Sequence, residues 1–238
     1  MVESILPLEL AGACVRRRGK ALVGPVDLTI SGRELTMVIG PNGSGKTSLL
    51  RMLHGLERTR DGTLSWAVSK ELARRRQAFV FQTPILMRRT VVENIAYPLI
   101  VRGVGRKHAR EKAVQWAARV DLDAYLDRPA SALSGGERQK MTMVRALITD
   151  PEVLFLDEPC ASLDGTSTRE IEELLIQTRR QGTTIVMSTH DLGQARRLAD
   201  RIVLLLRGKV HEACSAEGFF RQPATAEGES FLQGGIVE

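Results

Sequence analysis

Hydrophobic residues along this chain gather in short consecutive runs that alternate with longer segments where they recur at helical spacing. The short runs predict buried strands at 35–39, 79–81, 153–156, 183–188 and 202–206. The segments between these strands predict helices at about 47–53, 167–181 and 192–198, and the residues after the last strand predict a hairpin turn at 207–209. Because strands that alternate with helices are typical of an α/β domain, we expect a largely parallel sheet.

Between 90 and 149 the pattern is helical. Separate helices are predicted at 91–100 and 107–120, because the glycines of Arg102-Gly103-Val104-Gly105 interrupt the spacing. These helices fall between strands of the α/β frame. We therefore interpret about 85–149 as a helical subdomain inserted into a single domain that spans 1–238. We expect the last segment, 214–238, to be a short C-terminal tail.

Composition and charge narrow the class of protein. Of 238 residues, 43% are hydrophobic and 26% are charged, which excludes a disordered or fibrous chain. The longest aliphatic run, 202–206, is far shorter than the roughly 20 residues that cross a bilayer, and no secretory leader is evident, so we expect neither a span nor secretion. Cys14, Cys160 and Cys214 lack metal-ligand spacing and are interpreted as free thiols. A net charge of +6 permits contact with nucleic acid or an anionic membrane without requiring either.

A phosphate-binding loop is predicted between the first strand and the first helix. The segment fits G-x-x-x-x-G-K-[ST] in full, with residues Gly40, Pro41, Asn42, Gly43, Ser44, Gly45, Lys46 and Thr47. Gly43 and Gly45 can take positive φ, which turns backbone N–H groups inward on a phosphate chain. Lys46 supplies a charge for the β- and γ-phosphates, and the Thr47 hydroxyl suits Mg²⁺. The alternative is a glycine-rich turn that only caps a helix.

Two carboxylates follow the buried run 153–156. Burying either one without a partner is costly, so a cation or a bound water is expected beside them. Since strand side chains alternate between faces, Asp157 and Glu158 need not have the same task. Asp157 suits Mg²⁺ through its water shell, and Glu158 suits activation of an attacking water as a general base. By itself, a solvated strand end would explain the pair equally well.

A second anion site is predicted before the helical run 140–148. Ser134 and Glu137 have the spacing of a capping box. A cap does not explain Gly135 and Gly136, since glycine is costly in a first helical turn. A hydroxyl and bare N–H groups at a helix start would bind a phosphate. Two anion sites for one γ-phosphate suggest a nucleotide held between two copies of the chain.

At this point the sequence resembles the nucleotide-binding subunit of ABC transporters, over roughly 5–213. The motifs stand in the order of that family: the loop 40–47, Gln82, the segment 133–139, the strand end 153–158, the segment 161–164 and His190. The resemblance implies a P-loop NTPase core with a mostly parallel sheet, an N-terminal antiparallel β portion and the inserted helical subdomain. It implies ATP and Mg²⁺ as ligands and a homodimer in which each ATP lies head to tail between the loop 40–47 of one copy and Ser134 of the other.

The family roles fall on matching residues. Gln82 would reach Mg²⁺ and the water, Asp164 would contact the opposite phosphate loop, and His190 would hold the γ-phosphate, Glu158 and the water. The alternatives are a surface glutamine, a helix N-cap and a structural histidine.

The resemblance fails at one place near the N-terminus. Family members usually stack adenine on an aromatic residue there, but the first aromatic residue of this chain is Trp66. A guanidinium plane of Arg16, Arg17 or Arg18 would stack instead, or these residues form a solvated basic turn. We therefore expect weak selectivity for the base, with the phosphates dominating affinity.

Transport would require separate transmembrane permease subunits and, for an importer, a solute-binding protein. The segment 83–89, with apolar Ile85, Leu86 and Met87, is a candidate docking edge, although ordinary packing explains it equally well. The segments around 82–91 and 219–232 are similar to importer subunits for small oxyanions, tungstate in particular. The expected location is the cytoplasmic face of the cell membrane. The alternatives are an exporter or lipoprotein-release ATPase, or a soluble ABC ATPase acting on nucleic acid or ribosomes; the latter usually has fused cassettes or a long insertion, so no nucleic acid is expected.

Overall fold

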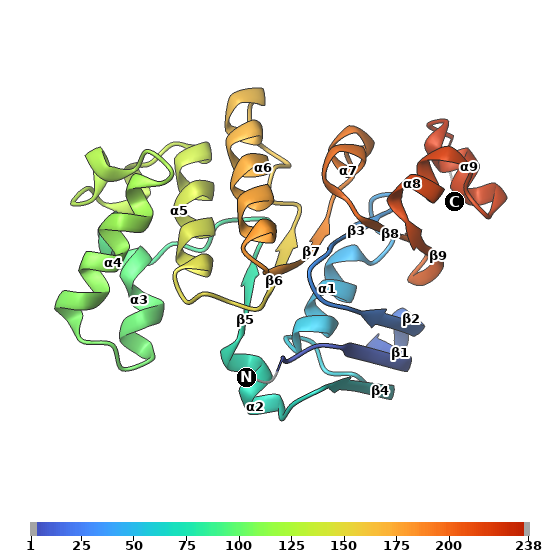
Figure 1. Ribbon diagram of the computed structural model, residues 1–238. Helices are drawn as coiled ribbons and strands as arrows, with labels where there is room; N and C mark the ends of the chain where they lie inside the picture. Colours follow the sequence, from blue (N-terminus) through green and yellow to red (C-terminus); the bar gives the residue numbers. More distant parts are fainter. Residues whose placement is uncertain (1–3, 236–238) are drawn as a thin grey trace.

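A six-stranded sheet with the strand order β5-β6-β7-β3-β8-β9 crosses the middle of the protein (Figure 1). The computed structural model describes residues 4–235. The strands are β3 (Leu35–Ile39), β5 (Gln77–Val80), β6 (Val153–Asp157), β7 (Thr184–Ser188), β8 (Arg201–Leu206) and β9 (Lys209–Ser215). All neighbouring pairs are parallel except β8 and β9. The predicted α/β class with a mostly parallel sheet is confirmed.

One predicted strand is displaced along the chain. β5 covers Gln77–Val80, whereas the hydrophobic run indicated 79–81. Gln77 pairs with Val153 at the start of the ladder, and its buried side-chain amide donates to the His54 carbonyl oxygen at 3.1 Å. A buried polar residue thus begins this strand, which a search for hydrophobic runs does not detect.

Alternate residues of the central strands enter two separate cores. In β3, Met37 packs with the helices on one face, while Val38 packs on the other face against helix α1 (Lys46–His54). The same alternation runs through the neighbouring strands, as expected for strands buried on both faces. Helix α1 therefore lies between the central sheet and a second sheet, with its N-terminus at the carboxyl edge of β3 (Figure 1).

The second sheet has three antiparallel strands in the order β2-β1-β4. They are β1 (Leu8–Arg17), β2 (Lys20–Ile30) and β4 (Asp61–Trp66), and the short helix α2 (Lys70–Arg75) follows β4. The antiparallel N-terminal portion implied by the resemblance is confirmed. Register shifts interrupt the pairing of β1 with both neighbours, which breaks the simple alternation of polar and apolar residues. For this reason the hydrophobic pattern alone did not delimit β1.

Three helices between β5 and β6 pack against one another at one end of the sheet (Figure 1). They are α3 (Val91–Val101), α4 (Arg106–Ala118) and α5 (Gly135–Leu147). The predicted break between the first two is confirmed: Gly103 takes φ 85° after α3, and Gly105 precedes α4. Two 3₁₀ turns, Asp123–Tyr125 and Ala130–Ala132, lead from α4 to α5.

After β6 the chain forms α6 (Gly165–Arg180), β7 and α7 (Leu192–Leu198) before the hairpin of β8 and β9. The turn of this hairpin has positive φ at Arg207 and Gly208, as the predicted turn requires. β9 runs to Ser215, past the expected start of the tail at 214, and the remainder forms α8 (Ala216–Arg221) and α9 (Ala226–Leu232). The carboxylate of Glu212 on β9 accepts the N–H groups of Ala224 and Thr225, which holds α9 against the sheet.

The three cysteines lie in the described part of the chain. Cys14, Cys160 and Cys214 are free thiols, and burial raises the pKa of Cys160 to about 11, which keeps that thiol protonated and unreactive near neutral pH. Within residues 4–235, no helix has both the length and the hydrophobicity needed to cross a membrane.

Candidate functional site

The loop 40–47 joins the carboxyl end of β3 to the first turn of α1. Gly43 and Gly45 have φ values of 80° and 104°, as predicted. A Cβ atom on Gly43 would meet nothing within 4 Å, so the backbone is open to a ligand there. The loop is supported from behind, because the Gly208 N–H donates to the Ser44 carbonyl oxygen at 2.8 Å and the Gly24 N–H donates to that of Gly208 at 2.7 Å. The N-terminus of α1 thus offers inward N–H groups and its positive dipole end to an anion.

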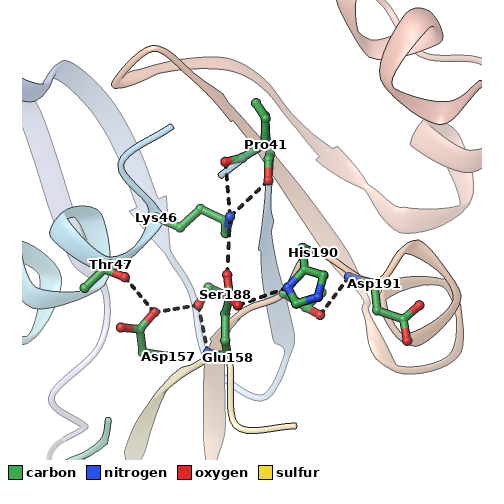
Figure 2. A network of polar contacts seen from close by, with 10 residues as sticks. Pro41, Lys46, Thr47, Asp157, Glu158, Ser188, His190 and Asp191 are labelled. Atoms are coloured by element: carbon green, nitrogen blue, oxygen red, sulfur yellow. Dashed lines mark hydrogen bonds and ion pairs between the residues drawn. The ribbon is translucent and has the colours of Figure 1, made fainter. Parts of the chain in front are cut away.

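The Lys46 ammonium lies inside this loop and is only 6% exposed (Figure 2). It donates to the carbonyl oxygens of Gly40 and Pro41 at 3.0 and 3.2 Å, and it lies 3.4 Å from Glu158 Oε1. The nearby Ser44 hydroxyl is buried and has no hydrogen-bond partner within residues 4–235. A phosphate would give both groups the acceptors that a buried cation and a buried hydroxyl require, so the loop fits a phosphate chain.

Two of the three predicted Mg²⁺ residues, Thr47 and Asp157, are in direct contact, and the third is Gln82. Thr47 Oγ1 donates to Asp157 Oδ1 at 3.0 Å, and Ser188 Oγ donates to the same oxygen at 2.9 Å (Figure 2). A hydroxyl beside one buried carboxylate suits Mg²⁺, a hard cation that takes few protein oxygens and keeps several waters. Residues 4–235 hold no cluster of three or more His, Cys, Asp or Glu side chains arranged for a metal.

Ser188 was not identified from the sequence. It ends β7, is fully buried, and its hydroxyl also accepts the Glu158 N–H at 3.0 Å. It therefore fixes both Asp157 and the backbone that carries Glu158. The available signal was a polar residue at the carboxyl end of a hydrophobic strand, the same signal that identified Asp157.

Glu158 and His190 meet beside the phosphate loop. His190 Nδ1 lies 3.0 Å from Glu158 Oε2, while the other carboxylate oxygen faces Lys46 (Figure 2). Glu158 has φ 45°, an uncommon conformation for a residue with a side chain, and it turns the chain sharply after β6. Asp157 and Glu158 consequently have different partners, as the alternation of strand faces predicted. A carboxylate held this way can accept a proton from a water next to the phosphate site.

A cavity of about 580 Å³ connects these groups. Gln82, which follows β5, lies on its wall together with Lys46, Thr47, Glu158 and His190. The carboxyl ends of β3, β5, β6 and β7 thus meet at one site, as expected for an open α/β sheet. The Gln82 side chain makes no hydrogen bond to the rest of the described chain, and it is free to turn into the cavity.

The other predicted residues lie outside this cavity, at two helix N-termini. Ser134 caps α5 in a capping box with Glu137, and Asp164 caps α6 by accepting the Ser167 N–H at 2.8 Å. These hydrogen bonds hold the pKa values of the Glu137 and Asp164 carboxyls below their usual range. Both residues are therefore helix caps, as the alternative interpretation predicted. The N-terminal ends of both helices face solvent.

The two glycines after Ser134 have different surroundings. A Cβ on Gly136 would lie 2.6 Å from the Ser167 hydroxyl of α6, whereas one on Gly135 would meet nothing within 4 Å. Gly136 therefore also serves close packing of α6 on α5, a reason that the sequence did not reveal. Lys140 ties the same two helices through an ion pair of 2.6 Å with Glu170. Gly135, with Ser134, remains on an exposed surface.

The basic turn near the N-terminus is only partly available for stacking. The Arg16 guanidinium is paired with Asp61 at 2.7 Å, and Arg18 occupies the turn itself with φ 50°. The apolar wall of the cavity comes instead from Leu22 on β2, which is 37% exposed. Among the described residues, no Phe, Tyr or Trp lines this cavity.

Comparison with known proteins gives a consistent result. The family described as ABC transporter matches residues 23–161. The phosphate import ATP-binding protein PstB 2 of Natronomonas pharaonis is 38% identical over 97% of this chain and 87% of its own length. The tungstate uptake system ATP-binding protein TupC of Peptoclostridium acidaminophilum is 37% identical over 85% of this chain and 94% of its own length.

Among solved structures, a dimeric ATP-binding cassette in a post-hydrolysis state, bound to ADP and Pi, is similar to this chain. It is 27% identical, has a TM-score of 0.78, and the match covers 88% of this chain and 98% of that one.

Proposed function

This chain belongs to the ABC transporter family and is an ATPase, and from this premise we propose that it is the ATP-hydrolysing subunit of a membrane importer for a small solute. The observation that carries the proposal is the meeting of Lys46, Thr47, Glu158 and His190 around one cavity at the carboxyl edge of the sheet, with Asp157 bonded to Thr47 behind it.

The phosphate loop binds the ATP triphosphate. Backbone N–H groups of 40–47 surround the β- and γ-phosphates, Lys46 neutralises their charge, and Ser44 donates its unpartnered hydroxyl. Thr47, Asp157 and Gln82 would hold Mg²⁺, which when bound neutralises charge on the phosphates. Ser188 acts as a positioning residue, because its hydroxyl contacts both Asp157 and the Glu158 backbone.

Glu158 accepts the proton of the water that attacks the γ-phosphorus, and the bond to the ADP oxygen breaks. His190 holds the Glu158 carboxylate from the side opposite Lys46, so the carboxylate is fixed at both oxygens. Gln82 approaches the water and Mg²⁺ from the end of β5. General-base assistance of this kind contributes about 10²–10⁴-fold to the rate.

A second copy of the chain completes the site. Ser134 and Gly135 lie on an exposed helix N-terminus of the same chain but outside the cavity, so they are available to the γ-phosphate bound by a partner. Asp164, at the start of α6, would contact the opposite phosphate loop. The similar solved structure is a dimer bound to ADP and Pi, which supports assembly of two copies.

Base selectivity is expected to be weak. Within residues 4–235, the cavity wall has no Phe, Tyr or Trp to stack on a base, and its two carboxamides, Asn42 and Gln82, belong to the phosphate loop and to the expected Mg²⁺ position. Only a site built to hydrogen-bond a substrate group rejects analogues by factors of 10⁴ or more. We expect kcat/KM for GTP within about tenfold of that for ATP, measured by phosphate release. A GTP rate thousands of times lower, together with equal losses of ATP affinity on Arg16→Ala, Arg17→Ala and Arg18→Ala, would contradict this account.

The membrane partner is a permease, with a solute-binding protein in the complete system, and the chain works at the cytoplasmic face of the membrane. The relatives named for phosphate and tungstate uptake support a small inorganic oxyanion as the cargo. Of the predicted docking edge, Ile85 is 57% exposed, whereas Leu86 packs against the core. Exposed Tyr97 and Val101 on α3 are the other large apolar side chains of this region.

Co-purification tests the transporter assignment. The tagged chain extracted from its own membranes in mild detergent is expected to retain a permease. Ile85→Asp, which adds charge to the docking edge, is expected to release it, and Ser65→Asp, at an exposed position on β4, is expected to keep it. Recovery of ribosomes or nucleic acid in place of a membrane protein would favour the soluble ABC ATPase instead. A solute-binding protein in the recovered complex would separate import from export.

A further inference from the structure

A second cavity, of about 660 Å³, lies at the C-terminal end of α1. Helix α1, the loop after it, β4 and α2 form its walls. None of its lining residues belongs to the nucleotide cavity, which is at the opposite end of the same helix. Any ligand of this cavity would therefore bind independently of the phosphate loop.

Three cations line this cavity and only one carboxylate opposes them. Arg58, Lys70 and Arg74 have no ion-pair or hydrogen-bond partner within residues 4–235, and Glu57 is the acidic residue on the wall. His54 adds no charge near neutral pH, because burial and, to a smaller extent, Arg74 lower its pKa to about 4. The wall thus carries an excess of two positive charges that nothing in the described chain neutralises, which favours an anion.

The same wall contains buried polar atoms that lack partners. Gln77 is 5% exposed; its amide nitrogen donates to the His54 carbonyl oxygen, which leaves Oε1 as an acceptor without a donor. Glu57 Oε2 is also buried without a partner. Such atoms are rare in native proteins, where a water or a ligand normally satisfies them. His54 Nδ1, on the same wall, is buried without a partner as well, and a neutral imidazole nitrogen can donate or accept. The two oxygens are acceptors, so a matching ligand brings hydroxyl or amine donors as well as negative charge.

We propose that this cavity binds a phosphate ester of a polyol, with the phosphate at Arg58, Lys70 and Arg74 and the hydroxyl groups toward Gln77 and Glu57. A phosphate matches the guanidinium and ammonium donors, which bind it through charge-assisted hydrogen bonds. Trp66, Leu64 and Met52 supply the apolar part of the wall for the carbon skeleton. A soluble metabolite and a glycerophospholipid headgroup share this chemistry.

Trp66 provides a direct measurement of binding. The chain has two tryptophans, and Trp116 lies on α4, outside this cavity. In a Trp116→Phe background, the fluorescence of Trp66 is followed during titration with glycerol 3-phosphate and, separately, with phosphatidylglycerol vesicles. We expect a saturable change with at least one probe. Combined substitution Arg58→Ala, Lys70→Ala and Arg74→Ala is expected to weaken binding by about tenfold or more.

Two control variants separate this site from its alternatives. Arg106→Ala, Lys107→Ala and Arg180→Ala together remove the same charge from other exposed positions and are expected to leave the titration unchanged. Lys46→Ala, which disables the phosphate loop, is also expected to leave it unchanged. A response to glycerol 3-phosphate identifies a soluble ligand class, and a response to the vesicles alone identifies a headgroup. The proposal would be overturned if neither probe gave a saturable change, or if the two triple-alanine variants lost the fluorescence response equally. Loss of the response in Lys46→Ala alone would also overturn it. None of these outcomes would affect the proposed ATPase role.

Discussion

Glu158→Gln is expected to slow ATP hydrolysis by about 10²–10⁴-fold and to leave ATP binding intact. Glutamine keeps the size and the hydrogen-bonding oxygen of the side chain but cannot accept a proton from water. The Lys46 ammonium retains the carbonyl oxygens of Gly40 and Pro41 as partners, so the phosphate loop should keep its shape. Turnover is measured by phosphate release, and affinity by equilibrium binding of ATP.

The same variant should accumulate a dimer in ATP, because two chains close on nucleotide that they cannot hydrolyse. Sedimentation in saturating ATP and in ADP distinguishes this dimer from non-specific association. Glu173→Gln, an exposed carboxylate of α6, is the matched control and should hydrolyse ATP normally as a freely exchanging protein. Normal turnover in Glu158→Gln would remove this residue from its role as the base.

Ser134→Glu is expected to reduce hydrolysis by about a hundredfold or more, since juxtaposed like charges at an interface cost several kcal/mol. The new carboxylate would stand against the γ-phosphate bound by the partner chain. ATP binding to the single chain should persist, because Ser134 lies outside the cavity that contains Lys46. Hydrolysis and single-chain binding are therefore measured side by side.

Ser134 also caps α5, so the effect of charge must be separated from the loss of a cap. Ser134→Ala removes the cap at a cost of about 1 kcal/mol without adding charge. It should lower thermal stability about as much as Ser134→Glu but retain far more activity. Equal activity in the two variants, or unchanged hydrolysis in Ser134→Glu, would mean that the helix start of one chain does not meet the nucleotide of another.

The hydrophobic pattern predicted the central sheet well because its strands are buried on both faces and appear as uninterrupted apolar runs. It did not delimit the outer sheet, whose first strand changes register against both neighbours. It also missed α2, a helix of six residues with a single buried side chain at Ala73. Irregular pairing in β1 and slight burial in α2 leave little periodicity of hydrophobic residues to detect in these two elements.

In the candidate site, some residues could likewise be predicted from the sequence and others could not. Lys46 and Thr47 follow from a complete local motif, and Glu158 from its position at a strand end. Ser188 could not be assigned without the pairing of β6 with β7, which brings it opposite Asp157. The packing role of Gly136 likewise depends on how α6 approaches α5, a contact that joins residues far apart in the chain. Local motifs supply the reactive groups, while tertiary contacts determine what positions them.

The support of the phosphate loop by the β8–β9 hairpin has a consequence for biosynthesis. β3 emerges early from the ribosome, yet both of its neighbours in the sheet, β7 and β8, are made more than a hundred residues later. The Gly208 amide that holds Ser44 follows them. The nascent chain thus carries an unsupported apolar strand through most of its translation, and such long-range closure is slow. An apolar strand left exposed in this way is prone to aggregation until its neighbours have been made.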